Sequence, residues 1–103
     1  MILIQPGQNT YTYRVPRPLT EVGDYLLVEF WNPKDCVAFF SVQQPERCKQ
    51  YTDVVFDLSN KECGYYLLNI WQQVSDTNLD PSLADSHFVV NLGVQLVCPT
   101  CSA

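Results

Sequence analysis

The sequence predicts an all-β protein, a single antiparallel β-sandwich of about seven strands. Two patterns predict this fold. Apolar and polar residues alternate with a period of two in most segments, and turn-forming residues recur about every 8–12 residues. The composition agrees, because Tyr, Phe, Trp, Val and Thr dominate the apolar runs of a chain that is 13% aromatic. A chain of 103 residues has room for one domain with one hydrophobic core.

Five strands are expected in the first part of the chain, at residues 2–4, 11–15, 24–32, 36–43 and 51–58. Every second residue of a strand points to the same face, so the alternation also assigns the core side of each strand. The residues expected to face inward are Tyr11, Tyr13, Val15, Leu26, Val28, Phe30, Ala38, Phe40, Val42, Thr52, Val54, Phe56 and Leu58.

Two further strands are expected at residues 64–73 and 87–97. In the first of these, Tyr66, Leu68 and Ile70 are expected to face the core. In the second, the expected inward residues are Phe88, Val90, Leu92, Val94 and Leu96. The sandwich domain is therefore expected to span 1–97, followed by a short C-terminal tail at 98–103.

Turn chemistry separates these strands. The segment "NPKD" (32–35) has Pro at the second turn position, which suits a type I turn and predicts a hairpin over 24–43. "DPSLADS" (80–86) is expected to form one short helical turn behind Pro81. A Tyr near the start of the penultimate strand, here Tyr65 or Tyr66, is typical of immunoglobulin-like domains. That version of the sandwich is preferred, and a jelly-roll-like variant is the alternative.

The charge distribution excludes several classes of partner. The net charge is −5, and all six basic residues lie before residue 62. Surfaces that bind nucleic acids or anionic membranes need clustered cations, so neither partner is expected. No apolar run reaches 18 residues, and "MILIQPGQNT" lacks the basic start of a secretory signal. The chain is therefore expected to be made and kept in the cytosol, unless it leaves inside an assembly.

Five cysteines raise the possibility of metal binding or disulfide bonds. The pair in "CPTC", Cys98 and Cys101, could bind zinc, but no second ligand pair is evident, and a tail with free thiols is preferred. Cys36 and Cys48 could form a disulfide across neighbouring strands. Because cytosolic proteins are kept reduced, buried apolar cysteines are the preferred interpretation.

Other candidate sites are weaker, and no enzyme and no cofactor are expected. "DTNLD" (76–80) resembles the start of a calcium loop, but Pro81 replaces the required Gly and His87 replaces the required Glu. Asx turns in a surface loop explain these residues more simply. His87, the one histidine of the chain, is a candidate catalytic base, but a lone His that opens a strand is more often a surface residue, and no Ser-His-acid arrangement can be built around it.

The most informative feature is a strand that is apolar on both faces. In "GYYLLNIWQQ" (64–73), the face opposite the core carries Tyr65, Leu67 and Trp71, and Tyr25 and Trp31 add to this excess in the hairpin. Either a loop such as 74–86 covers this second face, or another subunit does. These five residues are the candidate subunit contact.

Residues 63–97, "CGYYLLNIWQQVSDTNLDPSLADSHFVVNLGVQLV", resemble the C-terminal half of small β-sandwich virion proteins of tailed bacteriophages of the crAss-like and Bacteroidetes types. "YLLVEFWN" (25–32) resembles an earlier strand of the same family. The chain departs from the pattern at Gln72 and Asn91, where the family tends to carry an acid. The positions that match are Gly64, Tyr65, Tyr66, Ile70, Trp71, Gln73, Ser75, Asn78, Asp80, Pro81 and Gly93.

The resemblance implies a structural role without catalysis, as a capsid-decorating, auxiliary or fibre-joining subunit. The implied partners are other virion proteins, with self-association, and the implied location is the virion. A carbohydrate- or host-surface-binding module, with Trp31 or Trp71 as a stacking platform, is the alternative function. A small zinc-dependent interaction domain is a third.

Overall fold

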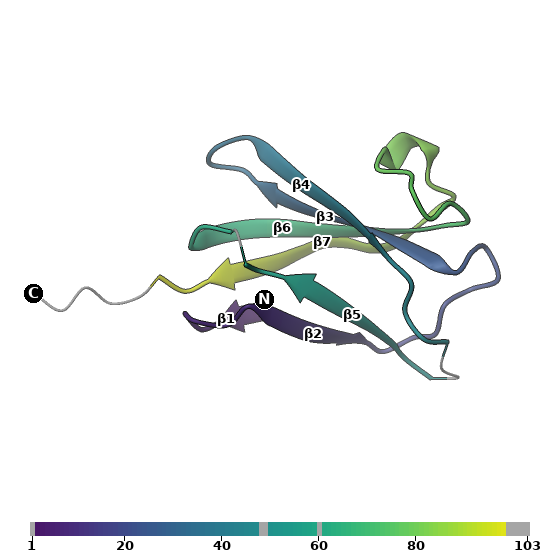
Figure 1. Cartoon of the computed structure of the whole chain (residues 1–103), viewed down its shortest axis with the longest axis horizontal. Coiled ribbons are helices and arrows are strands. Elements are labelled where there is room, and N and C mark those ends of the chain that lie inside the picture. The colour runs from purple at the N-terminus through teal and green to yellow at the C-terminus, as the bar shows by residue number, and fades with distance from the viewer. Residues whose placement is uncertain (1, 48–49, 60, 99–103) are drawn as a thin grey trace, which may run out of the picture.

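The computed structural model describes residues 2–47, 50–59 and 61–98. It is an all-β structure in which seven strands form two sheets, so the predicted class and strand number are confirmed (Figure 1). Among the described residues, the helical structure is limited to one 3₁₀ turn, η1 (Pro81–Leu83), where the sequence predicts it. The strands are β1 (Ile2–Ile4), β2 (Thr10–Val15), β3 (Tyr25–Asn32), β4 (Val37–Gln43), β5 (Thr52–Asp57), β6 (Gly64–Gln73) and β7 (Ser86–Leu96).

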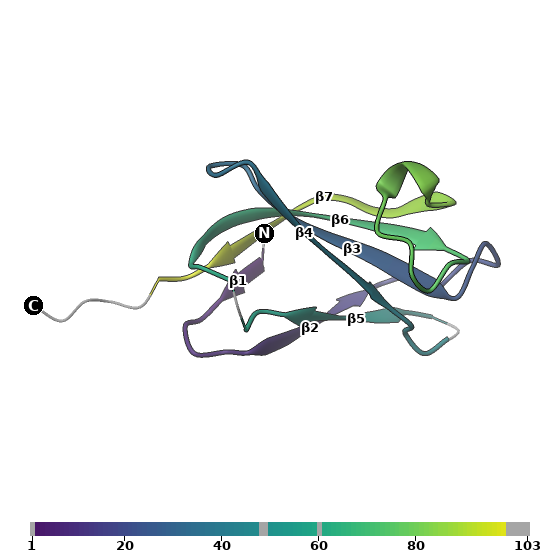
Figure 2. The ribbon, with the colours of Figure 1, turned by 45° about the horizontal axis from the view of Figure 1, so that its top comes forward.

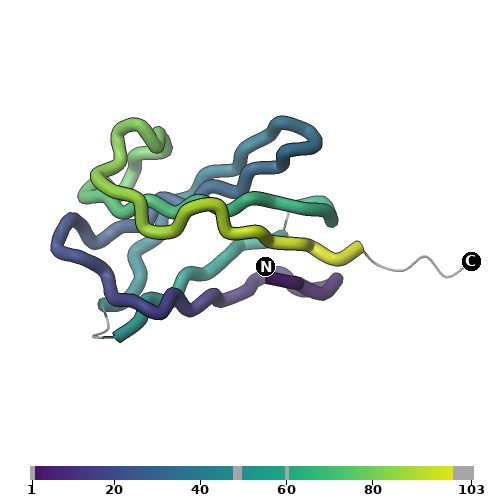
Figure 3. The backbone as a smooth tube through the Cα atoms, turned by 180° about the vertical axis from the view of Figure 1, so that it is seen from behind, coloured from purple at the N-terminus to yellow at the C-terminus, as the bar shows by residue number. Residues whose placement is uncertain are grey.

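The two sheets are very unequal in size. The larger one has the order β1-β7-β6-β3-β4, and the smaller one contains only β2 and β5. Figure 2 shows the small sheet below the large one, and Figure 3 shows β1 beside the end of β7. β1 runs parallel to β7, whereas the other pairs are antiparallel. The large sheet is therefore mixed, and the prediction of a purely antiparallel sandwich is wrong at this edge.

The core lies between the two sheets and follows most of the predicted alternation. The inward residues of β3, β5 and the first part of β6 are almost fully buried, as predicted, and Tyr11 and Tyr13 pack against them from β2. Phe30 and Phe56 meet edge to face at 5.3 Å across the sheets. The buried apolar residues of this core are Ile4, Val15, Leu19, Leu26, Val28, Phe30, Val54, Phe56, Leu58, Tyr66, Leu68, Ile70, Phe88, Val94 and Leu96.

The predicted inner face of β4 is wrong. Trp31 pairs with Ala38, Glu29 with Phe40 and Leu27 with Val42. Directly paired residues share a face, so Ala38, Phe40 and Val42 lie on the side of the large sheet that faces away from the small one. β4 is an edge strand in which odd-numbered and even-numbered positions both carry apolar residues. Its sequence pattern alone therefore does not identify the core side.

A β-bulge overturns one further inward assignment, at Val90. The register of β6 and β7 passes from Leu68↔Leu92 to Ile70↔Val89, so β7 carries an extra residue at this point. Asn91 adopts a left-handed conformation with φ of 52°. The bulge shifts the alternation, leaving Val90 57% exposed while Val89 packs against the core.

A buried glutamine fixes the segment between β2 and β3. Gln72 is fully buried, and its Oε1 accepts hydrogen bonds from Thr20 Oγ1 at 2.9 Å and Thr20 N at 3.3 Å. Its Nε2 donates to the carbonyl oxygens of Thr20 and Gly23. Gly23 lies so close to the end of β6 that a Cβ there would overlap the backbone carbonyl of Gln73.

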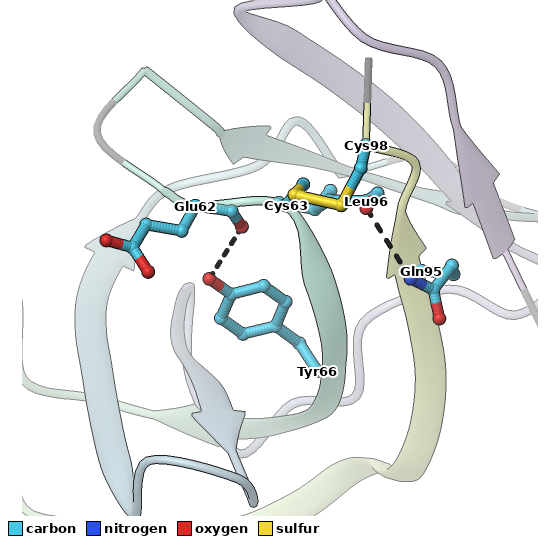
Figure 4. The surroundings of a disulfide bond; sticks show 6 residues. All are labelled: Glu62, Cys63, Tyr66, Gln95, Leu96 and Cys98. Carbon is cyan, nitrogen blue, oxygen red and sulfur yellow. Dashed lines mark hydrogen bonds between the residues drawn. A yellow bond between two sulfur atoms is a disulfide. The ribbon is translucent and has the colours of Figure 1, made fainter. Parts of the chain in front are cut away.

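Tyr66 anchors the start of β6 to the turn before it. Its ring is buried against Phe30, and its hydroxyl donates a 2.9 Å hydrogen bond to the carbonyl oxygen of Glu62 (Figure 4). Of the two predicted candidates for this role, Tyr66 fills it and Tyr65 does not. Burial raises the pKa of Tyr66 above its ordinary value of 10.0, and the carboxylates of Glu62 and Asp35 add to the shift.

A disulfide bond joins Cys63, just before β6, to Cys98, just after β7 (Figure 4). The prediction of free thiols in the tail is therefore wrong for Cys98, the first residue of the predicted tail. Residues 99–103, including Cys101 of the proposed zinc pair, lie outside the described residues. Because Gly64 pairs with Leu96, the bond closes the end of an already paired ladder.

The expectation of a buried cysteine is wrong at position 36. Cys63 and Cys98 of the disulfide are exposed, and Cys36 is an exposed free cysteine in the β3–β4 turn. Cys48, its suggested disulfide partner, lies outside the described residues. Within residues 2–47, 50–59 and 61–98, no helix has the length and apolar character that a membrane span requires.

We expect the disulfide to contribute substantially to stability. The linked cysteines are separated by 35 residues. Closing a loop of this size lowers the conformational entropy of the unfolded chain, which stabilises the folded state by about 3–4 kcal/mol. Replacing both Cys63 and Cys98 by Ser should lower the free energy of unfolding by up to this amount in urea denaturation. Cys36→Ser is the matched control and should leave it unchanged. Equal stability of the double variant and the wild type would contradict the prediction.

We expect Tyr66→Phe to cost about 1 kcal/mol near neutral pH, because a buried hydrogen bond is lost. The raised pKa of Tyr66 makes its contribution fully present below pH 10.0 and progressively lost as the pH rises through the higher folded-state value. The stability difference between wild type and Tyr66→Phe should therefore shrink above about pH 10. Urea denaturation of both proteins from neutral to alkaline pH measures this. A difference that stays constant with pH would rule the interpretation out.

Candidate functional site

The five candidate contact residues lie on one face of the large sheet. Leu27 pairs with Trp71, and Trp31 pairs with Leu67. By the same alternation, Tyr25 and Tyr65 point to this side, away from β2 and β5. We call this side of the five-stranded sheet the outer face. The register therefore brings Tyr25, Trp31, Tyr65, Leu67 and Trp71 together, as the sequence pattern predicts.

A loop covers one end of the outer face. Residues 74–85 connect β6 to β7 and rise over the sheet, with η1 at their top (Figure 2). Gln73 is almost fully buried beneath them, and its Nε2 donates to the carbonyl oxygens of Ser75 and Asn78. Asn78 Nδ2 returns a hydrogen bond to Gln73 Oε1 at 2.9 Å. Leu27, next along the same face, is also fully buried.

The other end of the outer face is open. Tyr65 and Phe40 are each 37% exposed, and Trp31, Leu67 and Ala38 are half-buried. The interpretation that a loop covers the second apolar face therefore holds over part of it, and a subunit contact over the remainder stays a prediction. The loop covers the Gln73 end, and the Tyr65 end carries exposed aromatic surface. Phe40 also lies at this open end, although the sequence predicts an inward position for it, because edge strand β4 has apolar residues at both odd and even positions.

Tyr65 and Gly93 form a close pair at the open end. A Cβ placed on Gly93 would lie 3.0 Å from the Tyr65 hydroxyl oxygen and 3.4 Å from a ring carbon. The Tyr65 ring therefore lies across the backbone of β7 at the one position of that strand without a side chain. This contact holds the ring flat on the sheet and explains why a glycine occupies the centre of an otherwise bulky strand.

A polar network crosses the middle of the outer face. Asn69 Oδ1 accepts the backbone N–H of Asn91 at 2.9 Å, and Asn69 Nδ2 donates to Glu29 Oε1 at 3.2 Å. The side chain of Asn69 thus satisfies the N–H that the β-bulge leaves outside the ladder. The network joins β3, β6 and β7 and places the carboxylate of Glu29 between Trp31 and Leu27 along its strand.

Trp71 lies near the covered end, against His87. The two rings are 5.0 Å apart with an angle of 34° between their planes, and they are directly paired across β6 and β7. His87 is exposed, whereas the neighbouring Ser86 pairs with Gln72 on the opposite face. The structure therefore gives His87 a packing partner on the outer face and does not bring Ser86 to it.

The calcium-like segment 76–80 is organised by its own side chains. Asp80 caps η1 by accepting hydrogen bonds from Ser82 N and Oγ, and Asn78 Oδ1 accepts from Asp80 N. These are the Asx turns that the sequence suggests. Across the part of the chain that the structure describes, no three His, Cys, Asp or Glu side chains form a group that could hold a metal ion.

We expect the bulge at Asn91 to tolerate glycine and to reject a β-branched residue. Glycine adopts a φ of 52° without strain and keeps the N–H that Asn69 accepts. Valine is strained in this conformation, and Asn91→Val should lower the free energy of unfolding by about 1–2 kcal/mol. Asn91→Gly should change it by about 0.5 kcal/mol or less. Urea denaturation measures both, and the reverse order of stability would contradict this account.

Comparison of the chain with models of protein families, with curated proteins and with solved structures found no match to any of the three.

Proposed function

We propose that this protein is an immunoglobulin-like structural subunit of a bacteriophage virion, which acts without catalysis through contacts made by its outer face. The observation that carries the proposal is the outer face itself. All five residues that the sequence marks as a subunit contact lie on one face of the large sheet, and the Tyr65 end of that face stays open. An apolar, aromatic sheet face of this kind suits a rigid protein–protein contact.

Three features support the immunoglobulin-like part of the proposal. The sheet order separates β2 and β5 from the other strands, as in the two sheets of that fold. The first strand runs parallel to the last one. Tyr66, near the start of the penultimate strand, bonds a carbonyl four residues upstream through its hydroxyl, in the manner of the tyrosine corner.

Residues that resemble the phage virion family have defined roles around the outer face. Tyr65 covers Gly93, and Gln73 anchors the loop through Ser75 and Asn78. Asp80 and Pro81 set the start of η1 in that loop. The motif therefore describes one unit, a strand with its covering loop and the returning strand, which shapes the surface proposed to meet other virion proteins.

The disulfide also favours this function over a protein that stays in the cytosol. Disulfide bonds persist in oxidising surroundings such as the surfaces of virions, and they are rare among reduced cytosolic proteins. A subunit synthesised in the host cytoplasm could form the Cys63–Cys98 bond once the particle is released.

The proposal predicts that purified virions contain this chain in many copies and that the outer face holds it there. The double substitution Tyr65→Ser and Phe40→Ser removes the two most exposed aromatic rings of the open end. It should leave the fold intact and reduce incorporation into particles at least about tenfold, measured by quantitative mass spectrometry. Leu83→Ser, at an exposed apolar residue in η1 outside the open end, is the matched control and should incorporate normally.

Two results would overturn this function. One is the absence of the chain from purified particles of the phage that encodes it. The other is normal incorporation of the double variant, which would move the contact away from the outer face.

A carbohydrate- or host-surface-binding function is the second candidate, favoured by the position of both tryptophans. Trp31 and Trp71 share the outer face with the carboxylate of Glu29 and the amide of Asn69. Aromatic rings beside polar groups of this kind can stack on sugars and bond their hydroxyls. Quenching of tryptophan fluorescence by a glycan, lost on Trp31→Ala, would support this candidate over a protein partner.

A further inference from the structure

The free edge of β5 in the small sheet has a feature that the outer face does not explain. Gln43, the last residue of β4, reaches across to the backbone of Val55. Its Nε2 donates to the Val55 carbonyl at 2.9 Å, and its Oε1 accepts the Val55 N–H at 2.9 Å. One side-chain amide therefore makes both hydrogen bonds that a peptide group of a neighbouring strand would make.

The alternation of the strand shows which other groups point to this edge. Since the N–H and C=O of Val55 face Gln43, those of Asp53 and Asp57 also point away from β2. On the other side, Leu58 donates its N–H to the carbonyl of Asn9, toward the β2 side. Beyond β5, no further strand lies in the small sheet among the described residues. The edge thus presents a row of backbone groups of which Gln43 bonds the central pair. At the Asp53 end, residues 43–46 face this edge across a hollow that Tyr51, Asp53 and Val55 also line.

The large sheet is also uncovered above this edge. Phe39 pairs with Phe30 and so faces the small sheet, yet it is 38% exposed. Phe30, Phe39, Asp57 and Lys61 line a hollow between β4 and the end of β5. The ammonium group of Lys61 lies 4.8 Å from the centre of the Phe39 ring and covers part of it. Figure 2 shows that β4 crosses over β5 and that the start of β4 lies farther from β5 than its end does.

We propose that the free edge of β5 binds an extended segment of a partner protein as a third strand of the small sheet, with the Gln43 amide holding the central position until that strand arrives. This is strand addition at a sheet edge, in which backbone hydrogen bonds give affinity and alternate side chains give specificity. The arriving strand replaces the two Gln43 bonds with its own and covers Phe39.

The negative charges along β5 indicate which kind of strand its edge would bind. Along the outward side of β5, Asp53 and Asp57 flank Val55, which is 49% exposed. A second copy pairing through its own β5 about Val55 would set Asp53 opposite Asp57 twice, and like charges directly opposite are destabilising. The β2 side shows the favourable arrangement, in which Arg14 lies opposite Asp53 at 2.9 Å. The partner strand therefore carries Lys or Arg four residues apart on its outward side and apolar residues facing Phe39.

A synthetic heptapeptide tests this proposal without knowledge of the natural partner. In the acetylated and amidated peptide TKVTVKT, paired antiparallel about Val55, the two lysines lie opposite Asp57 and Asp53 and the two valines face the core. Titration into ¹⁵N-labelled full-length protein should shift the amide signals of Val55, Asp57 and Phe39. The control peptide is TEVTVET, in which Glu replaces both lysines. It differs from TKVTVKT only in charge and should cause no shifts.

Substitutions at the edge complete the experiment. Val55→Pro removes the N–H that faces the edge and no hydrogen bond to β2, so peptide binding should weaken about fivefold or more. Val55→Ala keeps that N–H and should bind within about twofold of wild type. Gln43→Ala removes the competing amide, should tighten binding about fivefold, and does not depend on the proline variant folding.

Several outcomes would overturn the proposal. The absence of shifts with TKVTVKT in both the wild type and Gln43→Ala would do so. So would equal binding of TEVTVET, because the occupant would then not be chosen by charge. Shifts confined to Tyr65 and Trp71 would place the binding on the outer face instead. A wild-type dimer in sedimentation that Val55→Pro disrupts would identify a second copy as the occupant.

Discussion

The unequal size of the two sheets is the constraint on which the rest of this structure depends. Five strands lie over two, and the small sheet cannot cover the whole inner side of the large one. The core is therefore dense where β3, β6 and β7 face β2 and β5, and thin beneath β4. Lys61 and Gln43 close that thin side with a long cationic side chain over Phe39 and an amide on the Val55 backbone. This side of the core is thus covered by polar groups and not by packed apolar residues.

Two neighbouring glutamines at the end of β6 fix different segments to the two sides of the large sheet. Gln72 points inward and binds the segment before β3, while Gln73 points outward and binds the loop over the outer face. Each amide both donates and accepts, which a carboxylate cannot do at neutral pH. This accounts for glutamine at position 72, where the resemblance to the phage family leads one to expect an acid.

Much of the fold could be predicted from sequence because period-two alternation is strong where one side of a strand is buried. Thr52, Val54, Phe56 and Leu58 are all buried, and Tyr66, Leu68 and Ile70 are as well. The errors arise where alternation lacks that cause. β4 is an edge strand with apolar residues at both parities, and the bulge at Asn91 shifts the phase within β7 without a sequence signal strong enough to place it. The Cys63–Cys98 pair depends on strand register, which brings together residues distant in sequence.

The candidate site could be predicted in part, because the alternation of each strand places its residues on one face. This face carries Tyr65, Leu67, Trp71, Tyr25 and Trp31. The extent of loop cover depends instead on hydrogen bonds of Gln73, which the alternation does not describe.

The disulfide also determines what happens when the chain is cut between β6 and β7. Cys63 precedes β6 and Cys98 follows β7, so the bond encloses the loop 74–85 within a covalent ring. That loop is among the most exposed parts of the molecule, with Leu79 and Leu83 largely uncovered. A protease that cuts it once would open the ring but release neither piece, because the bond would still join β6 to β7. The protein would thus stay covalently whole after a single cut in this loop.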